Sequence, residues 1–474
     1  MSNPSHLSRR RFLQASAAAA VVRPWSGLRA AEPVAIFPLR AAPAIASIVG
    51  GEYPDTAVWA YGGIVPGPEI RVRQGQPLQV AFDNRLDEAT TVHWHGMRLP
   101  NAMDGVPELT QPPVPAGGRF TYEFTPPDAG TYWYHPHVRA SSQQGRGLYG
   151  ALIIEEAEPP KVDRELLWVL DDWRLTETAE IAGFGGGMDF SHGGRIGNTV
   201  TVNGRRPDDV AVQAGERIRL RLINTANART FGLRFKDVEM RVIALDGHPV
   251  TLHTSVDNRL TLASGQCADL IIDMAAKPGH AAVVSDDHYG DRYAYDLLAF
   301  THQPGPALRD SPLDAAMKLP DNPVKEPDLN DAQAARVTID GGAMGNMRDA
   351  VYKGQSMGVR ELWSHGKIWT LNGIAADRPD MSPIVTLPQG RSCRMTIRND
   401  TGWPHPMHLH GLAFRVLSRG GVPEPYRPWT DTVLLAPNKT AEIAFVADNP
   451  GDWLFHCHIL EHHAAGMSSV VRVS

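Results

Sequence analysis

The chain has 474 residues, 42% of them hydrophobic, with 44 Gly and 38 Pro, which excludes one small core and is typical of two to four turn-rich β-domains. Its three cysteines are too few for a disulfide framework, which excludes small disulfide-stabilised scaffolds. The formal net charge of −6 becomes −11 without residues 1–31, which hold five arginines and no acidic residue, so we expect no nucleic acid or anionic membrane as a partner.

The N-terminal residues 1–31 have the pattern of an export signal. Ser8-Arg9-Arg10-Arg11-Phe12-Leu13-Gln14 precedes an apolar run to Val22, and small residues follow at Ala30 and Ala31. This order is typical of a signal peptide, and the paired arginines indicate the twin-arginine export machinery as a partner. A buried first helix is the alternative, which Pro24 disfavours. We therefore expect a periplasmic protein, and no later stretch is apolar for long enough to give the mature chain a membrane span.

Three stretches of the chain repeat one pattern. Residues 75–84, 215–224 and 390–399 each begin with Gly, continue with alternating apolar residues and end in Asn. The alternation predicts a half-buried strand in each stretch. Nine residues after each Asn stand His93, Leu233 and His408, and eleven residues after it stand His95, Phe235 and His410.

A second alignment, counted from three other glycines, shows the same threefold repeat. Five and seven residues after Gly130, Gly279 and Gly451 stand, in turn, His135 and His137, Val284 and Asp286, and His456 and His458. The sequence therefore predicts three copies of one β-module, of which the middle copy has no paired histidines.

We place the first domain at 32–157, the second at 158–303, a Pro-rich linker at 304–327 and the third domain at 328–474. Each copy is long enough, and has enough short strands, for a Greek-key β-sandwich, so the expected fold is all-β. Residues 183–188 and 341–358 are expected to be flexible surface loops, and a functional lid is the alternative.

The last thirty residues contain the highest density of potential metal-binding side chains. If Trp453 to His458 is a strand, His456 and His458 lie on one face and Cys457 on the other. Cys457, followed by His462 and Met467, offers a thiolate, an imidazole and a thioether, a soft ligand set that suits a blue copper centre. Compared with the ligands of a blue copper centre, this set lacks one imidazole.

Three further His-x-His pairs stand elsewhere, and His405 precedes the last of them. The pairs are His93-Trp-His95, His135-Pro-His137 and His408-Leu-His410. A single pair would more often be a surface or core coincidence, but four pairs, one of them around a cysteine, indicate metal binding.

These motifs, His-Trp-His-Gly, Trp-Tyr-His-Pro-His, His-Pro-Met-His-Leu-His-Gly and His-Cys-His-Ile-Leu-Glu-His-x4-Met, stand in the order found in multicopper oxidases, and the chain resembles that family over nearly its whole mature length. The resemblance implies three consecutive cupredoxin-like domains and four copper ions: one type 1, one type 2 and two type 3. It also implies dioxygen as the electron acceptor.

The resemblance assigns a ligand set to each copper. Type 1 copper would take His405, Cys457 and His462, with Met467 axial, and type 2 copper would take His93 and His408. One type 3 copper would take His95, His135 and His458, and the other His137, His410 and His456. Eight histidines from the first and third domains must then converge where these domains meet.

Proton delivery has two candidates. Asp104, in the Asn-Ala-Met-Asp-Gly loop, matches a family carboxylate, and a turn-forming Asp-Gly is its alternative. Many relatives carry an acid directly after the last type 1 histidine, and this chain has His463 there. Glu461 and Asp431 are taken as surface carboxylates, with a contact to the type 1 histidines as the alternative. Cys267 and Cys393 are expected to be structural.

The substrate follows least directly from the sequence. Laccase-like oxidation of phenols or aromatic amines at an open His462 edge is the preferred interpretation. A cuprous oxidase of periplasmic copper tolerance is the alternative; it is disfavoured because Thr401 and Trp403 stand where copper-efflux relatives have Asp and Met. A non-catalytic copper-sequestering or scaffold protein is the alternative from another class.

Overall fold

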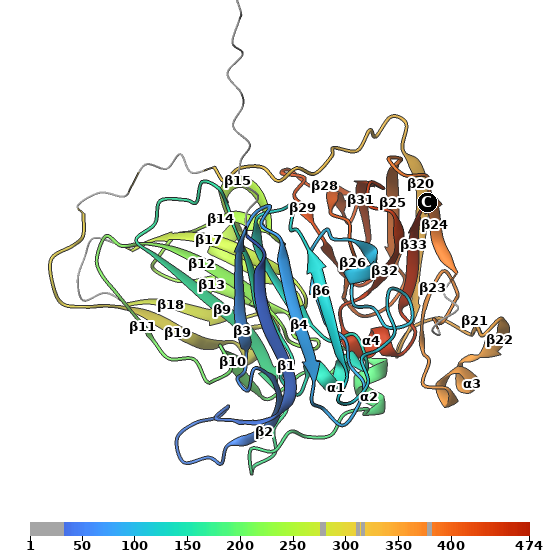
Figure 1. Ribbon diagram of the computed structural model, residues 1–474, viewed down its shortest axis with the longest axis horizontal. Helices are drawn as coiled ribbons and strands as arrows, with labels where there is room; N and C mark the ends of the chain where they lie inside the picture. Colours follow the sequence, from blue (N-terminus) through green and yellow to red (C-terminus); the bar gives the residue numbers. More distant parts are fainter. Residues whose placement is uncertain (1–32, 275–280, 310–312, 314–317, 377–381) are drawn as a thin grey trace, which may run out of the picture. The chain divides into compact units, whose positions relative to one another are not determined.

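The computed structural model describes residues 33–274, 281–309, 313, 318–376 and 382–474. These residues form strands, turns and loops with four short α-helices, so the prediction of an all-β fold is confirmed (Figure 1). The predicted export signal lies outside the described residues, as does Gly279. No described helix is long and apolar enough to cross a membrane.

The first sandwich has two four-stranded sheets around one core, which includes Val80, Phe82, Trp94 and Leu152. One sheet contains β1 (Ala35–Ala46), β2 (Thr56–Tyr61), β4 (Leu78–Asn84) and β6 (Arg119–Phe124). The other contains β3 (Gly67–Arg73), β5 (His93–His95), β7 (Gly130–His135) and β8 (Gly150–Glu155). The helix α1 (Ala140–Gln144) and the 3-10 turn η1 (Asn101–Met103) lie in its loops.

The second sandwich encloses Leu220, Leu233, Leu270 and Phe300. Its six-stranded sheet contains β9 (Arg164–Trp173), β10 (Thr199–Val202), β12 (Arg217–Asn224), β14 (Met240–Leu245), β15 (His248–Thr254) and β17 (Cys267–Asp273). Its five-stranded sheet contains β11 (Val210–Val212), β13 (Phe231–Phe235), β16 (Arg259–Leu262), β18 (Ala281–Asp286) and β19 (Tyr295–His302). The helix α2 (Gly187–Ser191) and the 3-10 turns η2 (Val256–Asn258) and η3 (Asp291–Tyr293) complete it.

The third sandwich encloses Ile397, Ile443, Phe455 and Val471. One sheet contains β20 (Gln333–Gly341), β23 (Trp369–Leu371), β25 (Ser392–Asn399), β27 (Phe414–Arg419), β28 (Val422–Pro423), β29 (Trp429–Thr430) and β31 (Thr440–Val446). The other contains β24 (Pro383–Leu387), β26 (His405–Leu409), β30 (Thr432–Leu435), β32 (Gly451–Cys457) and β33 (Ser468–Val473). The helix α4 (Leu460–Ala464) joins β32 to β33.

Each predicted repeat is a strand that ends at its asparagine, and the three side chains make equivalent bonds. The amide oxygens of Asn84, Asn224 and Asn399 each accept from the backbone N–H two residues on, at 3.0 Å. Each amide nitrogen donates to a carbonyl four or five residues on, in the following loop, and to a second carbonyl 30 to 38 residues on. A buried amide that closes this loop fixes the start of the next strand, which is the strand that carries the first histidine pair in the outer sandwiches.

The middle sandwich repeats the same strand pair without ligands. Strand β5 pairs with β7 so that His93 faces His135, and β26 pairs with β32 so that His408 faces His456. In β13 the corresponding Leu233 belongs to the apolar core and pairs with Asp286, two residues later than the sequence alignment predicted.

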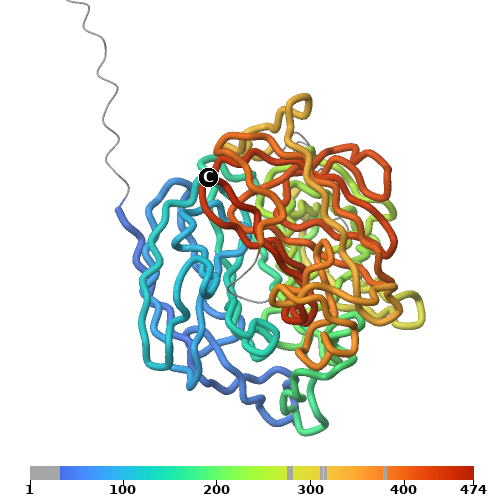
Figure 2. Tube along the Cα trace, turned by 90° about the vertical axis from the view of Figure 1, so that its right-hand side faces the viewer, coloured from blue at the N-terminus to red at the C-terminus, as the bar shows by residue number. Residues whose placement is uncertain are grey.

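The first and third sandwiches meet along the histidine-bearing strands. Figures 1 and 2 show residues 35–155, in blue to cyan, beside residues 333–473, in orange to red. Asn101 donates to the carbonyl of Asp452 at 2.9 Å, and Asn449 donates to that of Leu99 at 3.0 Å.

A buried ionic network joins the first and middle sandwiches. Arg219 contacts the carboxylates of Glu156 and Asp269 at 2.5 Å each, and Thr131 of β7 donates to Asp269 at 2.6 Å. Burial alone would raise the pKa of Asp269, but Arg219 and Arg221 hold that pKa below its usual value. The network therefore fixes β7, the strand that carries His135.

The prediction of a loop over residues 341–358 is wrong in part. These residues include a hairpin of β21 (Asp349–Tyr352) and β22 (Gln355–Gly358), and helix α3 (Val359–Ser364) follows. Because Tyr352, Met357 and Leu362 share a small core, the segment has its own packing. The loop prediction for 183–188 is also wrong in part, because only 183–186 are a loop and the next two residues begin α2, which belongs to the site described next.

Candidate metal centres

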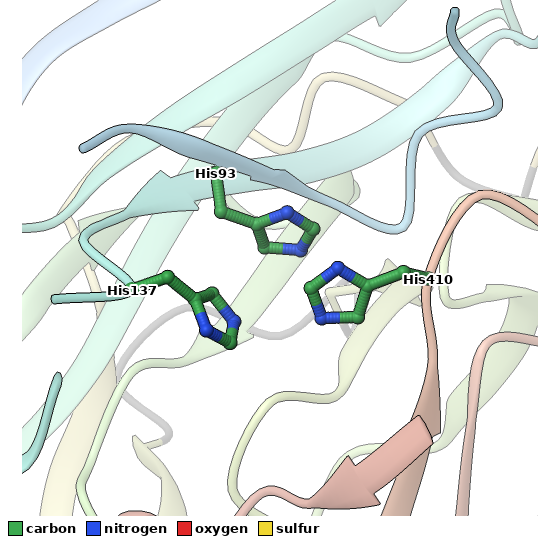
Figure 3. A group of neighbouring side chains, drawn as sticks. All are labelled: His93, His137 and His410. Carbon is green, nitrogen blue, oxygen red and sulfur yellow. The ribbon is translucent and has the colours of Figure 1, made fainter. Parts of the chain in front are cut away.

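Eight histidines from the outer sandwiches converge on one buried space, as the repeat predicted. Each is at most 3% exposed, and they are His93, His95, His135, His137, His408, His410, His456 and His458. Figure 3 shows three of them, from both sandwiches, pointing toward one another. Possible ligand atoms of seven of them form overlapping groups within 4.8 Å, His93 with His137 and His410 being one, and the His458 ring lies 4.9 Å from that of His95, so the eight rings make a single continuous nest.

Two carboxylates, one from each outer sandwich, hold the nest across the boundary. Asp104 accepts from His93 of its own sandwich, through its backbone oxygen at 2.7 Å, and from Nδ1 of His410 at 2.9 Å. Asp431 accepts from His408 of its own sandwich and from Nε2 of His95, both at 3.1 Å. This reciprocity ties four of the rings together and fixes which nitrogen of each carries the proton.

Asp431 is therefore not the surface carboxylate that the sequence suggested. It is 4% exposed and contacts cluster histidines rather than the type 1 histidines. Glu461 is also buried, and its carboxylate accepts from the Arg195 backbone N–H at 3.1 Å and from the Asn227 amide at 3.0 Å. Both interpretations as surface groups were wrong because the boundaries between sandwiches bury these carboxylates.

Two of the nitrogens that face the nest have no proton to share. His410 donates through Nδ1 to Asp104 and His456 donates through Nδ1 to the carbonyl of Cys457 at 2.8 Å, yet their two Nε2 atoms lie 3.1 Å apart. Two lone pairs at that separation repel each other unless a cation lies between them. Imidazoles bound to one metal at about 2.0–2.1 Å reach such a separation.

The second site lies on the other face of β32. Nδ1 of His405 and Nδ1 of His462 are 3.1 Å apart, and Sγ of Cys457 lies 3.6 and 3.7 Å from them. The outer nitrogens of both rings are engaged, with Thr401 Oγ1 at 2.8 Å and the His192 carbonyl at 2.6 Å. The two Nδ1 lone pairs and the Cys457 sulfur therefore form a triangle of possible ligand atoms, which a metal ion with trigonal coordination would suit.

The axial candidate lies beside this triangle. Met467 is fully buried in the core that contains Cys457, and its carbonyl accepts from the Cys457 backbone N–H at 3.2 Å. Burial raises the pKa of the Cys457 thiol well above its usual range, so the thiolate depends on a bound cation.

The expectation of an open His462 edge is wrong. The His462 side chain is fully buried, and its Nε2–H donates to the carbonyl of His192, the residue after α2 of the middle sandwich. Trp369 packs against the same ring at 4.3 Å between centroids. The sequence could not reveal the contact from His192, because this residue belongs to the middle sandwich, a domain without paired histidines.

Three family models, each described as multicopper oxidase, match residues 46–159, 164–292 and 351–474 of this chain. The multicopper oxidase MmcO of Mycobacterium tuberculosis is 31% identical, over 88% of this chain and 83% of that protein.

The chain belongs to the multicopper oxidase family. Among solved structures, the multi-copper oxidase from Pseudomonas thermotolerans has a TM-score of 0.81 and 36% identity, over 94% of this chain and 100% of that chain. A bacterial laccase-like CueO from Ochrobactrum sp., described as having oxidase activity towards lignin model compounds and lignosulfonate, has a TM-score of 0.75 and 25% identity, over 94% of this chain and 100% of that chain. The prediction of three cupredoxin-like domains is confirmed by these matches.

The family implies copper, and the buried nitrogens of this oxidase fit it. Seven ring nitrogens of six cluster histidines have no hydrogen-bond partner among the described residues: Nε2 of His93, His135, His137, His408 and His458, and Nδ1 of His95 and His137. Burial, and then the neighbouring rings, lowers the pKa of His458 to about 3. The same causes lower the pKa of His135, His137 and His456 well below its usual value. Neutral imidazole is the form that binds copper.

The two candidates for proton delivery lie at different depths. Asp104 is fully buried against the nest, whereas His463 is partly exposed, with its ring 4.5 Å from that of His456 and 5.6 Å from that of His137. His463 and His137 both line a surface pocket of about 330 Å³. The pocket thus brings solvent to a histidine of the nest.

The middle sandwich contributes a contact that nothing in the sequence indicated. Ser264 donates to the Ala226 carbonyl at 2.6 Å, so at 3.0 Å its Oγ accepts the Nδ1–H of His458. A side chain at Gly265 would press on the same ring, because its Cβ would lie 2.7 Å from Cγ of His458. The loop therefore fixes both the tautomer and the position of His458, with Nε2 toward the nest.

We predict that Ser264→Ala weakens copper binding in the nest by about 10–100-fold, because His458 loses the acceptor that fixes its tautomer. Copper per chain, with electron paramagnetic resonance (EPR) of the loaded protein, checks this. Ser285→Ala is the control, since Ser285 is a buried serine of the same sandwich. Equal copper affinity in both variants would contradict the role of Ser264.

Proposed function

We propose that this oxidase is laccase-like, removing one electron at a time from phenols or aromatic amines and passing four to dioxygen. The observation that carries this is the placement of Cys457, whose sulfur completes one triangle of lone pairs while its neighbours His456 and His458 line the nest. Bound copper would supply a one-electron acceptor at the triangle and four-electron reduction of dioxygen to two water molecules in the nest.

We propose the ligand sets that the family resemblance implies. His405, Cys457 and His462 would hold type 1 copper with Met467 axial, and His93 and His408 would hold type 2 copper. The two type 3 sets have ring centroids within 5.7 Å of one another, and they are His95, His135 and His458, and His137, His410 and His456. Other pairs of rings in the nest have centroids as close as these. The support for the proposed ligand sets is therefore the convergence of all eight rings and not any single distance.

The chain's own part in electron transfer is a short covalent path. From Sγ of Cys457 it runs through the cysteine side chain and one peptide bond to either neighbouring histidine. The hydrogen bond from His456 Nδ1–H to the Cys457 carbonyl, at 2.8 Å, offers a second path that avoids part of the backbone. Alternation of side chains along β32 separates the two sites while keeping them this close.

We assign the protons for water formation to two residues. Asp104 contacts a ring of each outer sandwich and would deliver a proton within the nest. His463, which lines the surface pocket, would pass protons inward from solvent in place of the acid that many relatives carry. The pocket would also admit dioxygen.

Oxidation of cuprous ion is the second candidate. It is favoured by two exposed thioethers in the segments that cover the type 1 triangle: Met188 of α2 is 66% exposed and Met344 is 75% exposed. Thioether sulfur is a soft ligand that suits cuprous ion. A non-catalytic copper-sequestering or scaffold protein has less support, because every ligand position is filled and buried.

One experiment separates these functions. Oxygen uptake by copper-loaded protein is measured with a phenol, an aromatic diamine and cuprous ion side by side, and four copper ions per chain are expected. Faster uptake with the aromatic compounds supports the laccase-like function, and faster uptake with cuprous ion supports the second candidate. No uptake with any of them by protein that holds four copper ions would refute catalysis.

We predict that Cys457→Ser abolishes the blue absorption and lowers oxygen uptake at least ~1000-fold, while the circular dichroism of the fold is retained. A hydroxyl cannot replace the thiolate at the triangle or the covalent path to the nest. Cys393→Ala, which removes the other buried thiol of the same sandwich, is the control and keeps both properties. Retained turnover in Cys457→Ser would refute the path.

For Asp104→Asn we expect normal anaerobic bleaching of the blue band by a diamine but roughly 100-fold slower reoxidation by dioxygen, the range of a lost proton donor. The amide keeps the acceptor oxygen for His410 but cannot give up a proton at neutral pH. Asp87→Asn, on an exposed carboxylate of the same sandwich, is the control. Unchanged reoxidation would exclude the proton role.

We also propose that the twin-arginine machinery exports this protein to the periplasm. The support is the sequence of residues 1–31 alone. Replacing Arg9 and Arg10 by Lys should leave unprocessed protein in the cytoplasm, as cell fractionation would report. Unchanged export of that variant would exclude the pathway.

A further inference from the structure

The type 1 triangle has no histidine edge at the surface. An electron that enters from a substrate would need a contact at His462, yet this ring is fully buried and its Nε2–H is engaged by the His192 carbonyl at 2.6 Å. His405 is equally buried, with its outer nitrogen on Thr401. A substrate therefore contacts the residues that cover these two rings and does not contact the rings themselves.

The cover is a segment of the middle sandwich held down by the third. The carbonyl of Phe190 accepts from the Trp369 indole at 2.6 Å, and that of Ser191 accepts from the Ala343 backbone N–H at 2.7 Å. The Trp403 indole in turn donates to the Ala343 carbonyl at 2.9 Å. Three hydrogen bonds between segments far apart in sequence make this a fixed part of the site.

Two aromatic side chains at the cover are partly exposed, His192 of the middle sandwich and Trp403 of the third. Their rings meet edge to face, with centroids 5.2 Å apart. The Trp403 ring also lies along Gly193, where a Cβ would come within 3.4 Å of it. The Trp403 indole thus contacts His192, whose carbonyl accepts from His462, and also contacts Gly193.

We propose that an aromatic reductant docks on the indole of Trp403 beside the imidazole of His192, and that its electron reaches His462 through the His192 carbonyl. The inference rests on the proposed type 1 site at His405, Cys457 and His462. A planar phenol or aromatic amine fits, because its ring can stack on the indole. His192 donates through Nδ1 to Ser191 Oγ at 2.8 Å, so Nε2 is the acceptor nitrogen for a hydroxyl or amine N–H.

The step is a simple electron transfer. A copper ion held by His405, Cys457 and His462 would supply a one-electron acceptor, and an aromatic diamine that gives up this electron becomes its radical cation. A phenol additionally releases its hydroxyl proton to water. No bond to carbon forms or breaks in either case, so the docking surface has only to hold the ring close to the cover.

The test is anaerobic stopped-flow bleaching of the blue band in copper-loaded protein, with p-phenylenediamine and with ferrocyanide. For Trp403→Ala we expect about tenfold slower reduction by the diamine and less than about twofold change with ferrocyanide, which cannot stack. Trp403→Phe, which keeps an aromatic ring, should recover most of the rate. The absorption and EPR spectra of the blue site should not change in either variant.

Trp363→Ala is the matched control. Its indole is also exposed, at 41%, but it packs against Gly187 at the start of α2. A diamine rate that is unchanged in Trp403→Ala, or equally reduced in Trp363→Ala, would overturn the docking role. Equal slowing for both reductants, together with an altered EPR spectrum, would also overturn the docking role. Trp403 would then only hold the metal-binding histidines of the blue site in position.

A second measurement needs no turnover. In deuterated buffer, electron–nuclear double resonance of the blue site should show slow exchange of the His462 Nε2 proton, because the His192 carbonyl covers it. Rapid exchange would show an open edge and overturn the inference. A protein that binds copper without a blue band would instead refute the proposed function, so the two failures are distinguishable.

Discussion

Buried imidazole nitrogens without protons are the constraint on which this structure depends. Inside the nest, lone pairs face one another at separations such as the 3.1 Å between His410 and His456. Burying a polar atom without a partner costs free energy, and lone pairs in a low dielectric repel. The packing of two sandwiches and the carboxylates of Asp104 and Asp431 hold the rings in this arrangement. A cation would convert each uncompensated nitrogen into a ligand, so the same atoms that oppose folding favour metal binding.

The middle sandwich has no ligand of its own but supports both sites. Ser264 sets the tautomer of His458, Asn227 holds Glu461, and the His192 carbonyl covers His462. All three targets lie within the stretch from β32 to α4. A domain that has an apolar core in place of paired histidines can be packed tightly, and a tightly packed neighbour can fix ring positions accurately.

The separation of the two sites comes from the geometry of one strand. Because side chains alternate, Cys457 faces the core of its own sandwich while His456 faces the boundary with the first. The proposed electron path is therefore short, and the environments of the two sites still differ. One is closed by a cover of aromatic side chains, and the other reaches solvent through the pocket that His137 and His463 line.

The sequence by itself determined the repeat, the absence of ligands from the middle copy and the faces of β32, because these follow from spacing and from the period of a strand. The motifs also indicated the family. Nothing in the sequence indicated that Asp431 and Glu461 are buried, or that Ser264 and His192 contact histidines of the two sites, because these contacts join sandwiches across 194 to 336 positions of the chain. The local pattern of a strand or loop contains no information about which surface will lie against it. Only the docking of three sandwiches decided which carboxylates are buried and that the His462 edge is closed.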